Sequence, residues 1–297
     1  MPERYELNLN VDDLVAIDTH VHIEVDDHGH NALSDVLVEA ASKYFKTDGP
    51  RPTLDVIAEM YRERKMAAVV FTVDATTSLG GHQPNSTEEI VAGAIRNNDV
   101  LIPFGTVDPL QGKAAIDRAR RQFEDLGVRG FKFHPTLQNF DPSDEAFFPL
   151  FEVIEQMEVP IVVHTGQTGI GSGLPGGHGL RLGLSNPMLL DTVAARFPAL
   201  DIVMAHPSVP WQEEALAVAT HKANVWIDLS GWSPKYFPES LVRQANSILQ
   251  NKVLFGSDFP LITPDRWLGD FANLQMKDEV RPKILKENAV RLLGLGT

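Results

Sequence analysis

The chain has 297 residues, of which 43% are hydrophobic and 22% charged, and its formal net charge is −14. This charge argues against nucleic acid and anionic membranes as partners, because both repel an acidic protein. There is no cysteine, which excludes disulfides and thiolate metal sites, so a metal ion would be held by His, Asp or Glu. The first residues lack the pattern of a signal peptide, and no apolar run is long enough to span a membrane, so we expect a cytoplasmic protein.

Apolar runs of strand length alternate with helix-like segments along the chain. The predicted strands are 14–22, 67–73, 100–107, 128–134, 159–164, 201–206, 224–230 and 252–258. The predicted helices are 32–45, 53–65, 86–98, 113–126, 143–157, 186–197, 212–221, 238–249, 265–274 and 279–293. Ser86 with Glu89 forms the pattern of a capping box, and Gly127 is a typical helix C-terminal signal. Eight strand–helix units predict an α/β fold, a closed (β/α)8 TIM barrel, with an extra C-terminal helix and a single domain over residues 1–297.

Two connections are longer than ordinary loops of such a barrel. Residues 24–52 follow the first strand, and we interpret them as an insertion that carries part of the site. His28 and His30 lie in this stretch, where we expect them to be solvated. The second long connection, 166–183, is rich in glycine but matches no phosphate-binding pattern, so we expect a mobile active-site loop.

Chemically active side chains collect at the ends of the predicted strands. In this barrel architecture the chemistry lies at the C-terminal ends of the strands. His20 and His22 end the first strand, and residues i and i+2 of a strand project from the same face, so the two imidazoles can share one metal ion. The other strand ends carry Lys132, His134, His164, His206 and Asp258. We therefore predict that these residues meet at one mouth of the barrel.

The strings DTHVH, GFKFHP, PIVVHTG, IVMAHPSVPW and VLFGSDFP, with the terminal ILKENAVRLLGL, resemble the amidohydrolase superfamily of metal-dependent barrels. More narrowly, they are similar to the amidohydrolase-related (amidohydrolase 2) subgroup that includes 2-amino-3-carboxymuconate-6-semialdehyde decarboxylase. The resemblance implies one divalent ion, zinc first with manganese or iron as alternatives. It implies that the metal ligands are His20, His22, His164 and Asp258. His206 and Asp258 would then be the catalytic groups for proton transfer.

Two of these residues leave other interpretations open. His206 could instead be structural or bind a second metal ion. Lys132 could pair with the substrate or with a carboxylate of the site; it could also be carboxylated and bridge two metal ions, as in binuclear members of the superfamily, or form a structural ion pair. His134 shares a face with Lys132, so we expect it to orient a ligand or contact the substrate.

Two further residues are candidates for substrate binding. Arg181, in the loop after the fifth strand, has the guanidinium fork that can clamp a carboxylate, although a surface position is an equal alternative. Trp232, which follows the seventh strand, could form one wall of an aromatic pocket.

The residues favour an enzyme over a non-catalytic barrel, because no member of the expected ligand set is missing. The first expectation is a hydrolase of a small organic acid or aromatic compound that uses metal-activated water. The alternative is non-oxidative decarboxylation, or hydrolytic C–C cleavage, of a carboxylated unsaturated or aromatic acid. Many aromatic-acid decarboxylases of the subgroup carry Glu before a single His on strand one, where this chain has His20 and His22; this difference places hydrolysis first. The expected partners are a small-molecule substrate and, by resemblance, a second copy in a homodimer.

Overall fold

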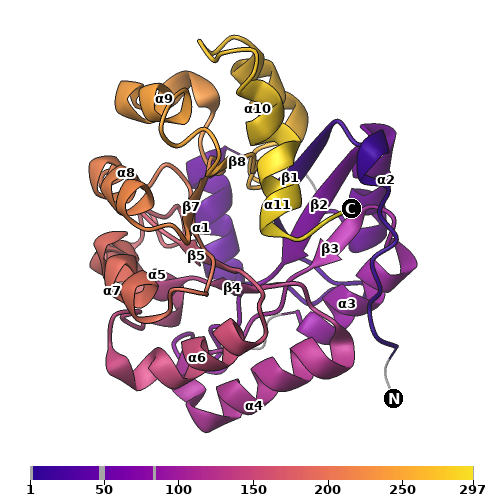
Figure 1. Cartoon of the computed structure of the whole chain (residues 1–297). Helices are drawn as coiled ribbons and strands as arrows, with labels where there is room; N and C mark the ends of the chain where they lie inside the picture. The colour runs from indigo at the N-terminus through magenta and orange to yellow at the C-terminus, as the bar shows by residue number, and fades with distance from the viewer. Residues whose placement is uncertain (1–2, 47–50, 83–84, 297) are drawn as a thin grey trace.

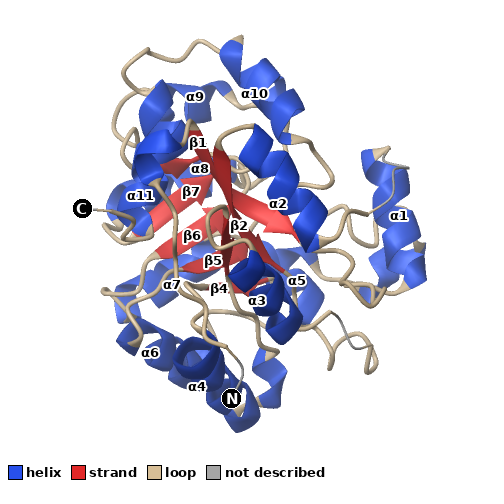
Figure 2. Cartoon of the chain, turned by 90° about the vertical axis from the view of Figure 1, so that its right-hand side faces the viewer, coloured by secondary structure: helices blue, strands red, loops and turns tan. Residues whose placement is uncertain are grey.

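The computed structural model of the chain describes residues 3–46, 51–82 and 85–296. Parallel strands occupy all of the predicted strand positions, although most of them are shorter than predicted. They are β1 (Ala16–His22), β2 (Met66–Phe71), β3 (Leu101–Pro103), β4 (Phe131–Phe133), β5 (Ile161–His164), β6 (Ile202–Ala205), β7 (Val225–Asp228) and β8 (Val253–Leu254). Figure 2 shows these strands at the centre of the molecule with helices around them.

The strands form one closed ring. β1 to β3 pair in order, and so do β4 to β8. A parallel bridge between Gly105 and Phe131 joins β3 to β4, and a second bridge between Val21 and Phe259 joins β1 to the segment after β8. Both open edges are therefore paired, and the predicted (β/α)8 barrel is confirmed.

Alternate residues of each strand belong to separate apolar clusters. In β2, Ala67, Val69 and Phe71 belong to the cluster in the barrel interior, whereas Ala68 and Val70 belong to the layer that packs against the surrounding helices. All six residues of β2 are buried. A strand that is covered on both faces needs a continuous apolar run, which explains why this strand could be recognised in the sequence.

The helices follow the strands in order. They are α1 (Asp35–Phe45), α2 (Leu54–Glu63), α3 (Thr87–Arg96), α4 (Lys113–Arg121), α5 (Pro135–Gln138), α6 (Phe148–Gln156), α7 (Met188–Arg196), α8 (Gln212–His221), α9 (Glu239–Ala245), α10 (Pro264–Ala272) and α11 (Asn288–Leu292). The capping box of Ser86 and Glu89 is present at the start of α3. Gly127 has a φ of 78°, the left-handed conformation of a C-terminal cap, and it ends the helical segment that continues from α4.

Two predictions for the helices were wrong in detail. The short helix α5 was not predicted, because it is a single turn that begins at Pro135 directly after β4. The predicted helix 279–293 is interrupted by a π-helical turn at Lys283–Glu287 before α11. Ala289 and Leu292 of α11 join the interior cluster with Ile17 and Leu254, so this last helix covers one end of the barrel.

The predicted insertion after β1 contains α1, and residues 47–50 of it lie outside the described part of the chain. Figures 1 and 2 show α1 and α11 at opposite ends of the barrel, with α1 standing away from the ring of helices. The end of α1 packs closely on the loop after β5, because a Cβ added to Gly169 would lie 2.4 Å from the Phe45 ring. The insertion therefore covers the end of the barrel opposite to α11.

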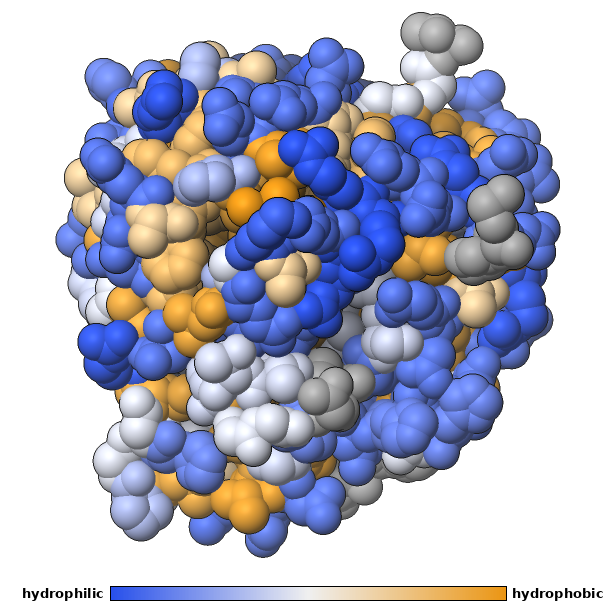
Figure 3. All heavy atoms as spheres, turned by 90° about the horizontal axis from the view of Figure 1, so that it is seen from below, coloured by the Kyte–Doolittle hydropathy of each residue, from blue (hydrophilic) through white to orange (hydrophobic). Residues whose placement is uncertain are grey.

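None of the helices in the described residues has the length and apolar character that a membrane span requires. The face of the molecule in Figure 3 is mainly hydrophilic, with hydrophobic side chains scattered among the polar ones.

Candidate metal centre and pocket

The seam where the barrel closes brings three predicted ligands together. His20 and His22 lie on β1, and the backbone N–H of Asp258 donates to the carbonyl of His20 at 3.0 Å. The two Nε2 atoms are 3.2 Å apart, and Oδ1 of Asp258 lies 3.3 Å from Nε2 of His20 and 3.2 Å from that of His22. Two atoms that each lie about 2.1 Å from one tetrahedral ion are about 3.4 Å apart. These separations are those of ligands that share an ion.

His164 is the fourth predicted ligand, and it lies at the end of β5. Its ring stacks on that of His134 with centroids 3.8 Å apart, and its Nδ1 lies 2.9 Å from Nε2 of His206. Its Nε2 is buried and has no hydrogen-bonding partner among the described residues. A buried polar atom without a partner is costly, so this nitrogen is free to coordinate an ion. His20, His22 and Asp258 have ligand atoms within 4.8 Å of one another, a group that does not include His164. With His164 as the predicted fourth donor, these residues form a set that zinc, manganese and iron accept.

Asp228, at the end of β7, is a site residue that the sequence analysis missed. It is fully buried, and its Oδ2 lies 2.8 Å from Nδ1 of His20. Its Oδ1 accepts hydrogen bonds from the backbone N–H groups of His206 and Ser230. Burial by itself would raise the pKa of Asp228, but the neighbouring His20 and His206 and the Ser230 hydrogen bond hold it below the usual range. A carboxylate in this position fixes the ring of His20 and leaves Nε2 for a metal ion.

His206 connects to the same network through Ser230. The Ser230 hydroxyl lies 2.8 Å from Nδ1 of His206 and 3.0 Å from Nδ1 of His20. Gly231 has a φ of 71°, and a Cβ there would lie 2.6 Å from Nδ1 of His206, so only glycine allows the loop to pass this ring. Burial lowers the pKa of His206, which favours a neutral imidazole.

His206 and Asp258 both have left-handed backbone conformations, with φ values of 71° and 70°. Residues other than glycine adopt this region at a cost of about 1 kcal/mol or more, and such residues concentrate at functional sites. The pKa of Asp258 lies well below its usual range, because the hydrogen bond from His22 and the electrostatic interaction with the rings of His206 and His20 outweigh the effect of burial. Asp258 is therefore a carboxylate at neutral pH.

Lys132 points into the barrel, as predicted from its alternation with Phe131 and Phe133 in the outer apolar layer. Its side chain is fully buried, with Nζ 3.1 Å from Nε2 of His20 and 4.8 Å from the centre of the Phe71 ring. Burial lowers the pKa of Lys132 to about 8, although the carboxylates of the site oppose this effect. Lys132 is not among the residues that line the pocket, and it lies beside His20 near the carboxylates of the site, which the sequence analysis gave as its other possible partners.

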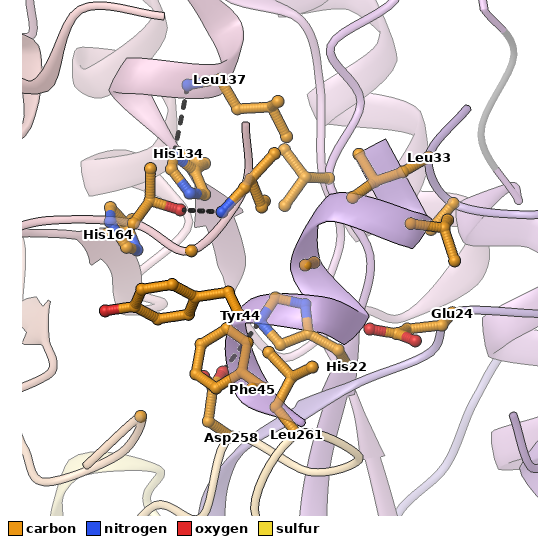
Figure 4. Close-up of a pocket in the computed structure, with 18 of the residues that line it drawn as sticks. His22, Glu24, Leu33, Tyr44, Phe45, His134, Leu137, His164, Asp258 and Leu261 are labelled. Atoms are coloured by element: carbon orange, nitrogen blue, oxygen red, sulfur yellow. Dashed lines mark hydrogen bonds and ion pairs between the residues drawn. The ribbon is translucent and has the colours of Figure 1, made fainter. Parts of the chain in front are cut away.

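A pocket opens over these groups at the C-terminal ends of the strands. Its floor contains His22, His134, His164, His206 and Asp258. Its walls are mainly apolar and aromatic and include Leu33, Tyr44, Phe45, Leu137, Ile170, Trp232 and Leu261. Figure 4 shows His22, His134, His164 and Asp258 in the pocket together with Leu33, Tyr44 and Phe45 from the insertion. The predicted substrate-binding residues His134 and Trp232 therefore do line the cavity.

The arginine in this pocket is not the predicted one. Arg181 is exposed, donates a hydrogen bond to Oδ1 of Asn139 at 2.8 Å and does not line the pocket, which corresponds to the surface position that the sequence analysis gave as the equal alternative to a carboxylate clamp. The first part of its loop, from Gln167 to Ile170, lines the cavity, and the later turns lead away from it. Arg51, from the insertion, lines the pocket instead, with Nε 2.5 Å from Oε2 of Glu24.

Comparison with known proteins identifies a family. The sequence profile described as Amidohydrolase matches residues 17–295. The fluG protein of Emericella nidulans is 30% identical over 129 residues, a stretch that covers 42% of this chain. This chain spans only 14% of the length of fluG.

Solved structures share the fold over nearly the whole chain. An uncharacterised TIM-barrel protein of Bordetella bronchiseptica has a TM-score of 0.76 at 21% identity, with 94% of this chain and 98% of that chain covered. The manganese-bound 5-carboxyvanillate decarboxylase of Novosphingobium aromaticivorans has a TM-score of 0.70 at 15% identity, with 98% and 99% covered. A 2,6-dihydroxybenzoate decarboxylase from Rhizobium has a TM-score of 0.66 at 16% identity, with 95% and 99% covered.

Proposed function

Because this chain belongs to the amidohydrolase family, we propose that it is a metal-dependent enzyme that decarboxylates a small carboxylated aromatic or unsaturated acid without oxidation. Two of the three named structural neighbours are decarboxylases of such acids, with manganese in one of them. The sequence placed hydrolysis first and decarboxylation second. Similarity of fold together with the character of the pocket reverses this order, while zinc and manganese remain alternatives for the ion.

The observation that carries the proposal is the contrast between the floor and the walls of the pocket. A ligand-rich floor lies beneath walls such as Leu33, Phe45, Leu137, Ile170 and Leu261. Loss of CO₂ removes a charge from the substrate, so apolar surroundings that strip water from a carboxylate favour the reaction. The same walls restrict the access of bulk water, which hydrolysis consumes.

Residues of the floor have distinct roles in this proposal. His20, His22, His164 and Asp258 would hold the ion, and the bound ion would supply a Lewis acid for an oxygen atom of the substrate. The C–C bond to the carboxylate breaks, CO₂ leaves, and the electron pair stays on the substrate carbon. That carbon must then gain a proton, which comes from the solvent because His206 is neutral and Asp258 is a carboxylate at neutral pH. Both residues line the pocket, and we assign to this pair the relay of that proton to the carbon.

We assign substrate recognition to residues in the walls of the pocket. Trp232 and His134 offer flat faces for an aromatic or conjugated acid. Arg51 takes the part that the sequence analysis gave to Arg181, because its guanidinium lines the cavity and is held by Glu24 and by the Ser42 hydroxyl at 2.8 Å. A fixed guanidinium favours a planar anionic group.

Hydrolysis remains the second candidate because of one observation, the pair of histidines on β1. Nε2 of His20 and Nε2 of His22 approach within 3.2 Å. In the resemblance described above, many aromatic-acid decarboxylases have Glu and a single His there. A metal ion with three imidazole ligands also suits the activation of water.

The experiment that tests the proposal is a comparison of products. Metal-loaded enzyme is incubated with hydroxybenzoates and unsaturated dicarboxylic acids on one side, and with lactones and amides of similar size on the other. We expect CO₂ release from the carboxylated set, and its loss in Asp258→Asn but not in the surface control His178→Ala. Ring opening or amide cleavage with no CO₂ from any acid would refute decarboxylation and favour hydrolysis. Size-exclusion chromatography of the same sample tests the predicted homodimer.

A further inference from the structure

A second group of metal-binding side chains lies outside the pocket, between the insertion and α3. Asp26 and His30 from the loop after β1 and Glu89 in the first turn of α3 have ligand atoms within 4.8 Å of one another. The imidazole of His28, from the same loop, forms an ion pair with Glu89 alone of these three. The sequence analysis expected both histidines to be simply solvated. Their side chains are 70% and 64% exposed, yet both rings face carboxylates.

The distances within this group are those of one hydrogen bond and two longer ion pairs. Nδ1 of His30 lies 2.6 Å from Oδ2 of Asp26, which is a hydrogen bond. Oε1 of Glu89 lies 3.6 Å from Nε2 of His28 and 3.9 Å from Nδ1 of His30. These last two separations are too long for hydrogen bonds, but atoms about 2.1 Å from a common ion are about 3 to 4 Å apart.

In each of the two carboxylates, the oxygen atom that does not face the imidazoles is held by hydrogen bonds. Asp26 is buried, and its Oδ1 accepts hydrogen bonds from the backbone N–H groups of His28 at 2.9 Å and His30 at 2.8 Å. Oε2 of Glu89 accepts from the backbone N–H of Ser86 in the capping box. Oδ2 of Asp26 and Oε1 of Glu89 therefore remain for the two imidazoles or for an ion between them.

We propose that Asp26, His28, His30 and Glu89 form a second, peripheral site for a divalent transition metal ion of the zinc class. Two imidazoles and two carboxylates from a loop and a helix suit zinc, whereas magnesium and calcium prefer sites made only of oxygen. A proton satisfies the pair of His30 and Asp26 but leaves Oε1 of Glu89 with long ion-pair contacts to the two rings, which an ion would replace with bonds. Binding replaces that hydrogen bond with two bonds to the ion.

The position of this peripheral site gives it a structural effect. Val25 pairs with Asn31 in an isolated bridge, and Asp27 forms an ion pair with Arg96 of α3 at 2.8 Å. Ala32 and Leu33, which follow directly, line the pocket. An ion held at the peripheral site would fasten the start of the insertion to α3 and so stabilise one wall of the cavity.

The test measures how many equivalents of zinc the full chain binds. Wild-type protein is equilibrated by dialysis against buffered low-micromolar Zn²⁺, and bound zinc is measured by elemental analysis. We expect one equivalent more in the wild type than in the double variant His28→Ala/His30→Ala. The variant Glu89→Gln keeps the capping hydrogen bond but loses a charge, and we expect it to bind the additional zinc at least about tenfold more weakly. Excess Mg²⁺ should not displace this zinc.

The matched control is His178→Ala/His221→Ala, which also removes two exposed histidines. It should keep the full zinc content of the wild type. Equal zinc content in wild type and His28→Ala/His30→Ala would overturn the proposal, and so would an equal loss in the control pair. Zinc that remains on the double variant is bound at the pocket site and shows that this variant has folded. The zinc content of the two sites is therefore measured separately.

Discussion

The proposed ligands of the pocket differ in how firmly each is held. His20 has Asp228 at Nδ1, and that carboxylate is itself fixed by two backbone N–H groups. His164 is held only from one side, by its contact with Nε2 of His206 and by stacking on His134. The free Nε2 of His164 is thus the most direct sign of a missing partner in the described residues.

Removal of His164 should empty the metal site. We expect His164→Ala to contain about one equivalent of metal less than the wild type, because a site that loses one ligand of a small set binds much more weakly. Elemental analysis of the purified proteins measures this, with His178→Ala as the control that changes an exposed histidine. Full metal content in His164→Ala would show that this residue is not a ligand.

Asp228→Asn should weaken metal binding without removing any ligand. The amide can keep a hydrogen bond to His20 but no longer favours the charge distribution that orients this ring, and such changes cost about 10- to 100-fold in metal affinity. Competition with a metal-binding dye measures the change. Asp201→Asn is the control, because this carboxylate precedes β6 and accepts from Trp226 at the other end of the strands. Unchanged affinity in Asp228→Asn would show that the contact is only structural.

For individual residues, the sequence predicted which residue types form the site better than it predicted where each side chain points. The rule that chemistry lies at strand ends located His20, His22, His164, His206 and Asp258, and the same rule applied to β7 would have found Asp228. No such rule predicts which residues of a loop reach the site. Arg181 and Arg51 both lie in long connections, and only the folded path of each loop decides which one reaches the cavity.

Among the elements, strands were the easiest to predict and helix ends the hardest. β2 is buried on both faces, so its composition alone reveals it. The helical segment after α4 ends as predicted because Gly127 must adopt a positive φ. The π-helical turn before α11 leaves no comparable signal, since it depends on how Ile284 packs into the core.

The capping box of α3 provides a test of stability at the level of one element. In Ser86→Ala the backbone N–H of Glu89 loses the Ser86 hydroxyl as its acceptor, at 3.2 Å in the native structure. We expect the free energy of unfolding to fall by about 1 kcal/mol. Urea denaturation measures it, with Ser247→Ala as the control for an exposed serine outside a helix N-terminus. A change no larger than that of the control would mean that the cap contributes little.

For the whole molecule, ion pairs on the outer surface contribute to the dependence of stability on acid. Hydrogen bonds from Arg62 and Arg64 lower the pKa values of Asp99 and Asp265. The pair of Arg64 and Asp265, with Nη2 and Oδ2 2.7 Å apart, joins α2 to α10. A carboxyl whose pKa is lower in the folded state stabilises the fold above its unfolded pKa of about 3.9, and this contribution is lost as the pH falls through the folded value.

We therefore expect Asp265→Asn to lower the stability at pH 7 by less than about 1 kcal/mol, since the pair is largely exposed. The difference from the wild type should shrink when the pH falls below about 4, where the wild-type carboxyl also becomes neutral. Urea unfolding of both proteins at pH 7 and near pH 3 gives the comparison. A constant difference at both pH values would exclude an electrostatic origin.

The hydrogen bond from the N–H of Asp258 to the carbonyl of His20 has a consequence for metal binding during synthesis of the protein. The last proposed ligand reaches the first only after the ribosome has produced every βα unit between them. A nascent chain that carries β1 to β7 can expose its histidines but cannot enclose an ion. Metal capture in the pocket therefore follows the synthesis of β8, and a supply of metal before that point would bring no benefit to folding at this site.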